Sequence, residues 1–84
     1  MATQEVTDRV QRLFVEALNI QVPSAETDVI DGGLLDSLKL VELLFALERE
    51  FDISIAMENL DIDTFRSVSR IADFVEETQG GGRA

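Results

Sequence analysis

The chemistry that this sequence offers is concentrated in one hydroxyl group, that of Ser37, which directly follows the carboxylate of Asp36. A serine works as a hydrolytic nucleophile only with a general base in hydrogen-bond reach and with donors for the oxyanion. The chain has no histidine, and the residues around Ser37 do not form the Gly-x-Ser-x-Gly turn of many hydrolases. The one lysine, Lys39, follows two positions later in a predicted helix and therefore points away from Ser37. The sequence argues against catalysis by this serine.

The same hydroxyl is well placed to carry a phosphate ester. Asp36 is a good N-cap, which predicts that a helix begins at Ser37. The first N–H groups of a helix have no partner within it, and the peptide dipoles add partial positive charge there, so an anion on Ser37 would be stabilised. An Asp-Ser pair alone indicates no more than a helix start. The surrounding residues 33–38, Gly-Leu-Leu-Asp-Ser-Leu, and the apolar helix after them favour an attachment site.

Hydrophobic periodicity predicts three main helices that must position this serine, over residues 4–19, 37–51 and 67–78. Thr3 and Ser67 are the predicted N-caps of the first and last helices. The expected fold is all-α, a small bundle of three to four helices.

The remaining segments are connections and ends. Residues 20–36 carry many apolar side chains, so we expect this connection to cross the bundle and bury some of them. Residues 52–66 have no clear pattern, and a short helix near 57–60, or a turn beyond it, is predicted there. One domain should span residues 1–79, followed by a flexible, glycine-rich tail at 80–84.

The second predicted helix is apolar on two faces. A wide stripe that can face the core consists of Leu40, Leu43, Leu44, Leu47 and Phe51. Another stripe begins beside Ser37 and consists of Leu38, Val41 and Phe45. A bundle of 84 residues has little room to enclose a helix, so we expect this second stripe to be partly exposed and open to a partner. The alternative is that a short third helix covers it.

Composition excludes several classes of function. The chain has no cysteine and no histidine, so disulfides and thiolate or imidazole metal sites are excluded, and we predict no metal centre. No apolar run approaches the roughly 20 residues that span a bilayer. The first residues lack the basic and apolar regions of a signal peptide, so a cytoplasmic protein is expected.

The negative charge is concentrated near Ser37. The net charge is −10, and residues 26–63 hold eleven of the 17 acids but only two of the seven Lys and Arg residues. Nucleic acid and anionic membrane would be repelled, and neither is expected as a partner. A protein partner with a basic patch is favoured, because complementary fields speed and orient encounters.

Residues 33–38, continued by the apolar and acidic residues of 41–43 and 46–51, resemble the acyl carrier proteins and the related peptidyl and D-alanyl carrier proteins. The likeness is strong over about residues 28–55 and extends loosely to the first and last helices. The resemblance implies a monomeric carrier that is not an enzyme, with the helical bundle of the acyl carrier protein type. It also implies that a phosphopantetheinyl transferase moves 4′-phosphopantetheine from coenzyme A onto Ser37. Asp36 would help to hold the catalytic magnesium, and Leu38 would lie beside the arm.

The resemblance further implies that the thiol of the arm carries acyl intermediates as thioesters in fatty acid, polyketide or specialised acyl biosynthesis, and hence in lipid metabolism. An acyl-loading ligase or transferase and downstream enzymes with basic patches would be the partners. Their contacts would be Leu38, Val41 and Phe45, with Glu42 and Glu48 meeting basic residues.

Two departures favour a carrier dedicated to one specialised pathway. Lys39 stands where fatty-acid-type carriers usually show an acid, and residues 57–63 match poorly. Two alternatives stay open, namely an aminoacyl carrier of the peptidyl or D-alanyl type and an unmodified helical module for protein interaction.

Overall fold

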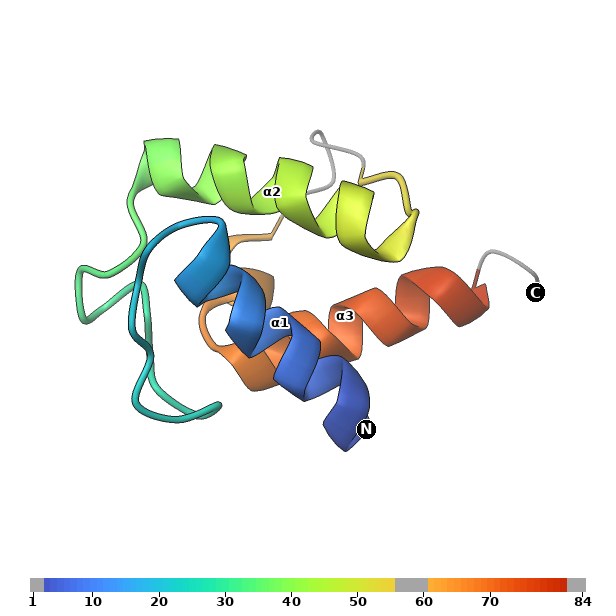
Figure 1. The fold of residues 1–84 in the computed structure, drawn as a ribbon, viewed down its shortest axis with the longest axis horizontal. Helices are drawn as coiled ribbons and strands as arrows, with labels where there is room; N and C mark the ends of the chain where they lie inside the picture. The colour runs from blue at the N-terminus through green and yellow to red at the C-terminus, as the bar shows by residue number, and fades with distance from the viewer. Residues whose placement is uncertain (1–2, 56–60, 82–84) are drawn as a thin grey trace.

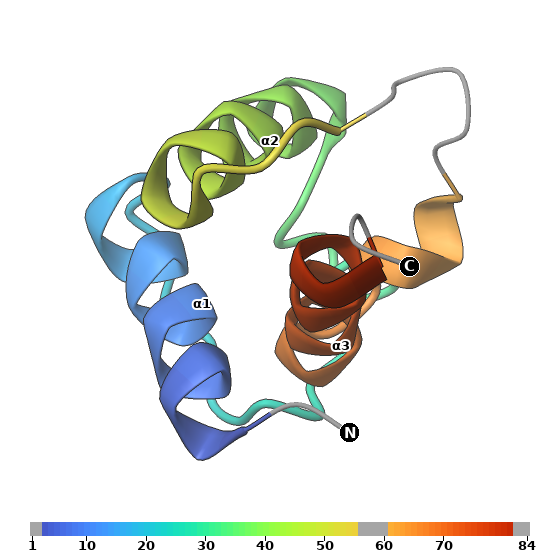
Figure 2. The ribbon, with the colours of Figure 1, turned by 90° about the vertical axis from the view of Figure 1, so that its right-hand side faces the viewer.

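The computed structural model describes residues 3–55 and 61–81 of the chain. Within them the order of elements is α1 (Gln4–Glu16), α2 (Ser37–Phe51), the 3₁₀ helix η2 (Ile62–Phe65) and α3 (Val68–Gly81). Figure 1 shows α2 lying across α1 and α3, and Figure 2 shows these three helices around a common centre, with η2 leading into α3. The predicted all-α fold is confirmed. No helix of the described part is long and apolar enough to cross a membrane.

Side-chain caps fix the starts of all three α-helices. Thr3 Oγ1 accepts a hydrogen bond from the Val6 N–H at 3.3 Å, and Asp36 Oδ1 accepts one from the Lys39 N–H at 2.9 Å. Ser67 Oγ likewise accepts from the N–H of Arg70, three residues later. Because each cap satisfies an N–H group that has no partner within its helix, the predicted start of each helix is confirmed.

Two predicted helix ends were wrong. α1 ends at Glu16, three residues before the predicted Asn19, and Asn19 itself adopts a left-handed conformation with φ of 59°. This turn sends the chain across the bundle, with the N–H of Ile20 donating to the carbonyl of Phe14. α3 instead continues to Gly81, beyond the predicted end at 78 and into the predicted tail. Glycine weakens a helix by about 1 kcal/mol without forbidding it. The domain boundary between 79 and 80 stays a prediction, and residues 82–84 lie outside the described residues.

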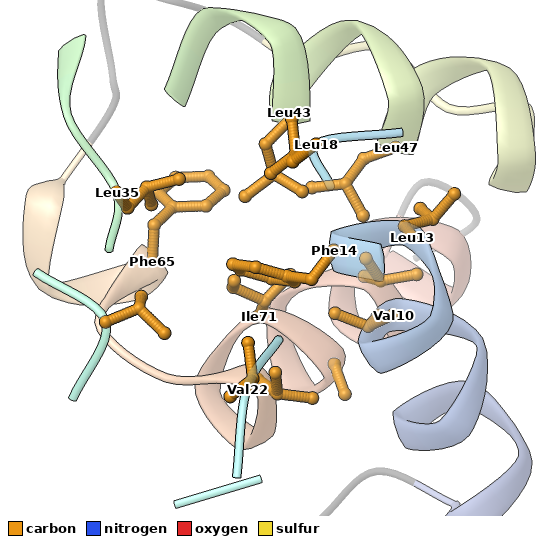
Figure 3. Packing of buried hydrophobic residues seen from close by; sticks show 14 of the residues in the cluster. Val10, Leu13, Phe14, Leu18, Val22, Leu35, Leu43, Leu47, Phe65 and Ile71 are labelled. Atoms are coloured by element: carbon orange, nitrogen blue, oxygen red, sulfur yellow. The ribbon is translucent and has the colours of Figure 1, made fainter. Parts of the chain in front are cut away.

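The core contains residues from every described helix. Figure 3 shows Phe14 from α1 between Leu43 and Leu47 on one side and Ile71 on the other. Phe65 of η2 is also fully buried, and its ring meets the ring of Phe74 edge-on, with the centroids 5.5 Å apart. The core stripe predicted for α2 is confirmed, since four of its members are buried and Leu40 is partly buried.

The connection between α1 and α2 is part of the fold. It buries Val22, Val29 and Leu35, as predicted. The Val29 N–H donates to the carbonyl of Arg66 at 2.8 Å, and the Ser69 N–H donates to the carbonyl of Ala25 at 2.9 Å. The segment is therefore bound to the polypeptide just before and at the start of α3.

Residues 61–66 turn the chain into α3. Asp61 Oδ1 accepts a hydrogen bond from the Asp63 N–H at 3.0 Å and so caps η2. This 3₁₀ helix provides the turn predicted after residue 60. The short helix predicted near 57–60 lies outside the described residues.

Candidate attachment site

Ser37 is the first residue of α2, and its side chain is exposed. Asp36 precedes it in an extended conformation and caps the helix through Oδ1, while its carbonyl accepts the first helical hydrogen bond, from the N–H of Leu40 at 2.8 Å. The structure thus places the hydroxyl of Ser37 at a helix N-terminus and open to solvent. The partial positive charge there suits a phosphate ester.

The backbone before Ser37 is firmly held. The N–H groups of Leu34 and Leu35 both donate to the carbonyl of Val29, at 3.0 and 2.9 Å. Gly33 turns the chain with φ of 77°, a conformation that other residues adopt only with strain. Leu35 is buried two positions before the serine, so the segment that leads to Ser37 is packed against the core.

An ion cluster around Arg66 joins the connection before Ser37 to η2. The guanidinium lies 3.2 Å from Asp28 Oδ2, 2.9 Å from Asp63 Oδ1 and 3.7 Å from Asp31 Oδ1. The backbone N–H of Asp31 donates to the Asp28 carboxylate and, with Arg66, holds the pKa of Asp28 below its ordinary value. Hydrogen bonds to Asp63 and Asp28 raise the pKa of Arg66. Sequence reasoning missed Arg66, although it is the only basic residue between Arg49 and Arg70.

A cavity of about 260 Å³ opens beside the serine. Most of its surface is apolar, and its lining residues come from the connection, from the start of α2 and from η2: Ile30, Leu35, Asp36, Ser37, Leu40 and Ile62. The sequence had not singled out Ile30 or Ile62 as site residues. Their approach depends on the packing of η2 against the connection, which no local pattern encodes.

The second stripe of α2 faces outward. Leu38 is 67% exposed and Phe45 is 62% exposed, while Val41 is partly buried between them. A second cavity, of about 190 Å³, lies on this side of the helix and is lined by Val41, Leu44, Phe45, Glu48 and Ile55. The predicted partial exposure of the stripe is confirmed. Whether residues 57–60 form the alternative covering helix falls outside the described residues.

The charged residues predicted for docking differ in their surroundings. Glu42 is exposed, and its carboxylate lies 3.8 Å from the ammonium group of Lys39. Glu48 is partly buried, and its Oε2 accepts a hydrogen bond from the Ile55 N–H at 2.8 Å. Glu48 therefore also holds the segment that follows α2. The ammonium group of Lys39 also reaches the carbonyl of Leu18, at 3.4 Å, and so joins α2 to the connection just after α1.

Comparison with known proteins gives two findings. Residues 8–75 match the family described as the phosphopantetheine attachment site. The chain is also 34% identical over 76 residues to the D-alanyl carrier proteins of Streptococcus pyogenes serotype M5 (strain Manfredo) and serotype M1. In both cases the alignment covers 90% of this chain and 92% of the relative. The matched residues include all of α2 and the serine at its start.

Proposed function

Since the chain belongs to the family of phosphopantetheine-binding carrier proteins, which are non-catalytic and carry 4′-phosphopantetheine covalently, we propose that Ser37 is the attachment residue. The observation that carries this proposal is the exposed Ser37 hydroxyl at the N-terminus of α2, directly after the capping carboxylate of Asp36. The residues present fit the group, because a helix N-terminus favours a phosphate and an apolar cavity lies beside it.

Each residue of the site has a distinct task in this proposal. The Ser37 Oγ would lose its proton and displace adenosine 3′,5′-bisphosphate from coenzyme A, which breaks the pyrophosphate bond and forms the phosphodiester. The first turn of α2 would stabilise the negative charge of that phosphodiester. Asp36 holds the helix start through one carboxylate oxygen, and a carboxylate can bind the magnesium ion of the transferase through the other. When bound, the arm supplies a terminal thiol that holds a cargo as a thioester, which the chain itself could not do without cysteine.

We propose a carrier dedicated to one acyl pathway, loaded by its own ligase or transferase. Lys39 supports this choice, because it places a positive charge in the first turn of α2 and joins that turn to the connection just after α1. A carrier of the fatty-acid type usually shows an acid at this position. The 34% identity to D-alanyl carrier proteins favours a second candidate, an aminoacyl cargo. Both candidates use the same arm and the same attachment chemistry.

Partners would dock on the outward stripe of α2. Leu38 and Phe45 offer exposed apolar surface within about 12 Å of the serine along the helix axis, with Val41 between them and the exposed acid Glu42 beside them. Glu48, a partly buried acid, lines the second cavity. We infer that the transferase, the loading enzyme and the downstream enzymes meet a monomeric carrier here through basic patches, in the cytoplasm, where coenzyme A is available.

The test is intact-protein mass spectrometry after incubation with coenzyme A, magnesium and a broad-specificity phosphopantetheinyl transferase. We expect wild type to gain one phosphopantetheinyl group and Ser37→Ala to gain none. Ser54→Ala, which changes another exposed serine, is the matched control and should be loaded like wild type. A folded wild type that stays unmodified would favour the unmodified interaction module, and a loaded Ser37→Ala would move the attachment elsewhere.

The cargo is tested on the loaded protein. The holo form is incubated with ATP and one of two ligases. The first adenylates a carboxylic acid that has no amino group, and the second adenylates D-alanine. Mass spectrometry then reads which group the thiol takes up. Preferential acylation supports the first candidate, and preferential transfer of D-alanine supports the second.

A further inference from the structure

We propose that the cavity beside Ser37 receives the pantoyl segment of the arm, with Ile62 as the positioning residue that forms its outer wall. The inference rests on the proposed function, because it requires the arm to be attached at Ser37. The cavity has a volume of about 260 Å³, and both Asp36 and Ser37 lie on its lining, so it is continuous with the attachment point.

The walls of the cavity come from three separate parts of the chain. Ile30 belongs to the connection before α2, Leu40 belongs to the first turns of α2, and Ile62 is the first residue of η2. Ile62 is 49% exposed, one of four large apolar side chains in residues 3–55 and 61–81 that are markedly exposed. Leaving such a side chain in water is unfavourable, and a ligand that covers it gains hydrophobic stabilisation.

The order of chemical groups along the arm determines which segment can fit the cavity beside Ser37. After the phosphate, the first apolar group is the pantoyl carbon that bears two methyl groups, about as bulky as a leucine side chain. The amides and the thiol follow farther along the arm. Because the phosphate is joined to Ser37, the dimethyl group is the part of the arm best placed to fold back into a cavity that includes this residue.

Contacts within the chain itself hold the walls of the cavity in place. Phe65 anchors the end of η2 in the core, and the cap of Asp61 fixes its start. Arg66 pairs with Asp28 of the connection, two residues before Ile30. A site whose walls are already in place loses little conformational freedom on binding, which favours even a small apolar ligand.

The experiment uses protein loaded with ¹³C-labelled pantetheine, with loading established by mass. In loaded wild type we expect the signals of the two geminal methyl groups, which are diastereotopic and already distinct in free coenzyme A, to be displaced from their positions there. We also expect nuclear Overhauser effects from these methyls to Ile62 and Leu40. In Ile62→Ser the displacement should fall by at least half, and in Ile62→Leu it should be retained.

Val15→Ser is the matched control, because Val15 is an exposed apolar residue of α1 that does not line the cavity. It should leave the methyl signals as in wild type. The ¹H–¹⁵N spectrum of each unloaded variant shows that the fold is kept. Loaded wild type with methyl signals at their free positions, or an Ile62→Ser variant that matches wild type, would overturn this inference alone. Failure to load Ser37 would overturn the proposed function as well.

Discussion

Arg66 and Asp28 lie 38 positions apart in the sequence, yet their guanidinium and carboxylate groups are 3.2 Å apart in the fold. The Arg66 side chain also binds Asp63 at 2.9 Å, and its backbone carbonyl accepts the N–H of Val29. One residue thus joins η2 to the connection that leads to Ser37. The two sides of the cavity next to that serine are held together by this residue, which itself lies outside the cavity lining.

The Asp28–Arg66 pair should make stability depend on pH. The folded state holds the pKa of Asp28 below 3.8, chiefly through the N–H of Asp31, so the unfolded chain takes up this proton first as the pH falls. The contribution is complete above the unfolded pKa and is lost as the pH falls through the folded pKa. We expect Asp28→Asn to lower the midpoint of urea unfolding at pH 7, and the difference from wild type to shrink below about pH 4. Glu16→Gln, at an exposed acid of α1, is the control. An equal difference at pH 7 and pH 3 would contradict the role of charge.

Two substitutions at Asp36 test its role as a helix cap and the role of its negative charge separately. Asp36→Ala removes the acceptor for the Lys39 N–H and should lower the free energy of unfolding by about 1 kcal/mol. Asp36→Asn keeps an acceptor and should be nearly as stable as wild type. If the charge helps to hold the magnesium ion of the transferase, both variants should be loaded more slowly. Circular dichroism melts and initial rates of loading measure the two effects, and rapid loading of Asp36→Asn would assign the residue to capping alone.

Two phenylalanines of α2 should behave in opposite ways. Phe51 is buried beneath the guanidinium of Arg9, which lies 4.6 Å from its ring centroid, so Phe51→Ala should cost about 3–5 kcal/mol of stability. Phe45 is exposed, and Phe45→Ala should change stability by no more than about 0.5 kcal/mol. As a docking contact, however, Phe45 should matter to partners, and its truncation should lower kcat/KM for loading about tenfold. Unchanged loading kinetics for a folded Phe45→Ala variant would remove this residue from the docking surface.

The acidic surface should make the fold sensitive to salt. A net charge of −10 on 84 residues repels itself, and counter-ions screen that repulsion. We expect Tm to rise with added sodium chloride and more steeply with magnesium chloride, as followed by circular dichroism. A constant Tm across both titrations would show that the charges are already compensated in the fold.

Local signals predicted the parts of the structure that depend on neighbouring residues. The start of α2 followed from Asp36, because a cap acts within three residues. The end of α1 did not follow, because Asn19 turns the chain to bring the connection across the bundle, a tertiary requirement. The end of α3 was placed too early, because glycine disfavours a helix without ending it.

The same distinction applies to the site. Ser37 and the outward stripe could be found in the sequence, since both lie on one helix with a regular period. Ile62 and Arg66 could not be placed beside Ser37, because their position depends on how η2 packs against a distant segment. The cofactor followed from the family resemblance, since a hydroxyl at a helix start does not specify which phosphate ester it carries.

One consequence follows from having Ser37 and the outward stripe on the same uninterrupted helix. Phe45 lies eight residues after Ser37, which corresponds to about 12 Å along the helix axis. In the proposed function, an enzyme that binds the Phe45 ring therefore also sets the position of Ser37, where the arm is attached. A shift of the docked helix by one turn would move the Ser37 oxygen by about 5.4 Å relative to the active site of that enzyme. Accurate delivery of the cargo would then depend mainly on how α2 docks. The flexibility of the arm would compensate only for smaller displacements.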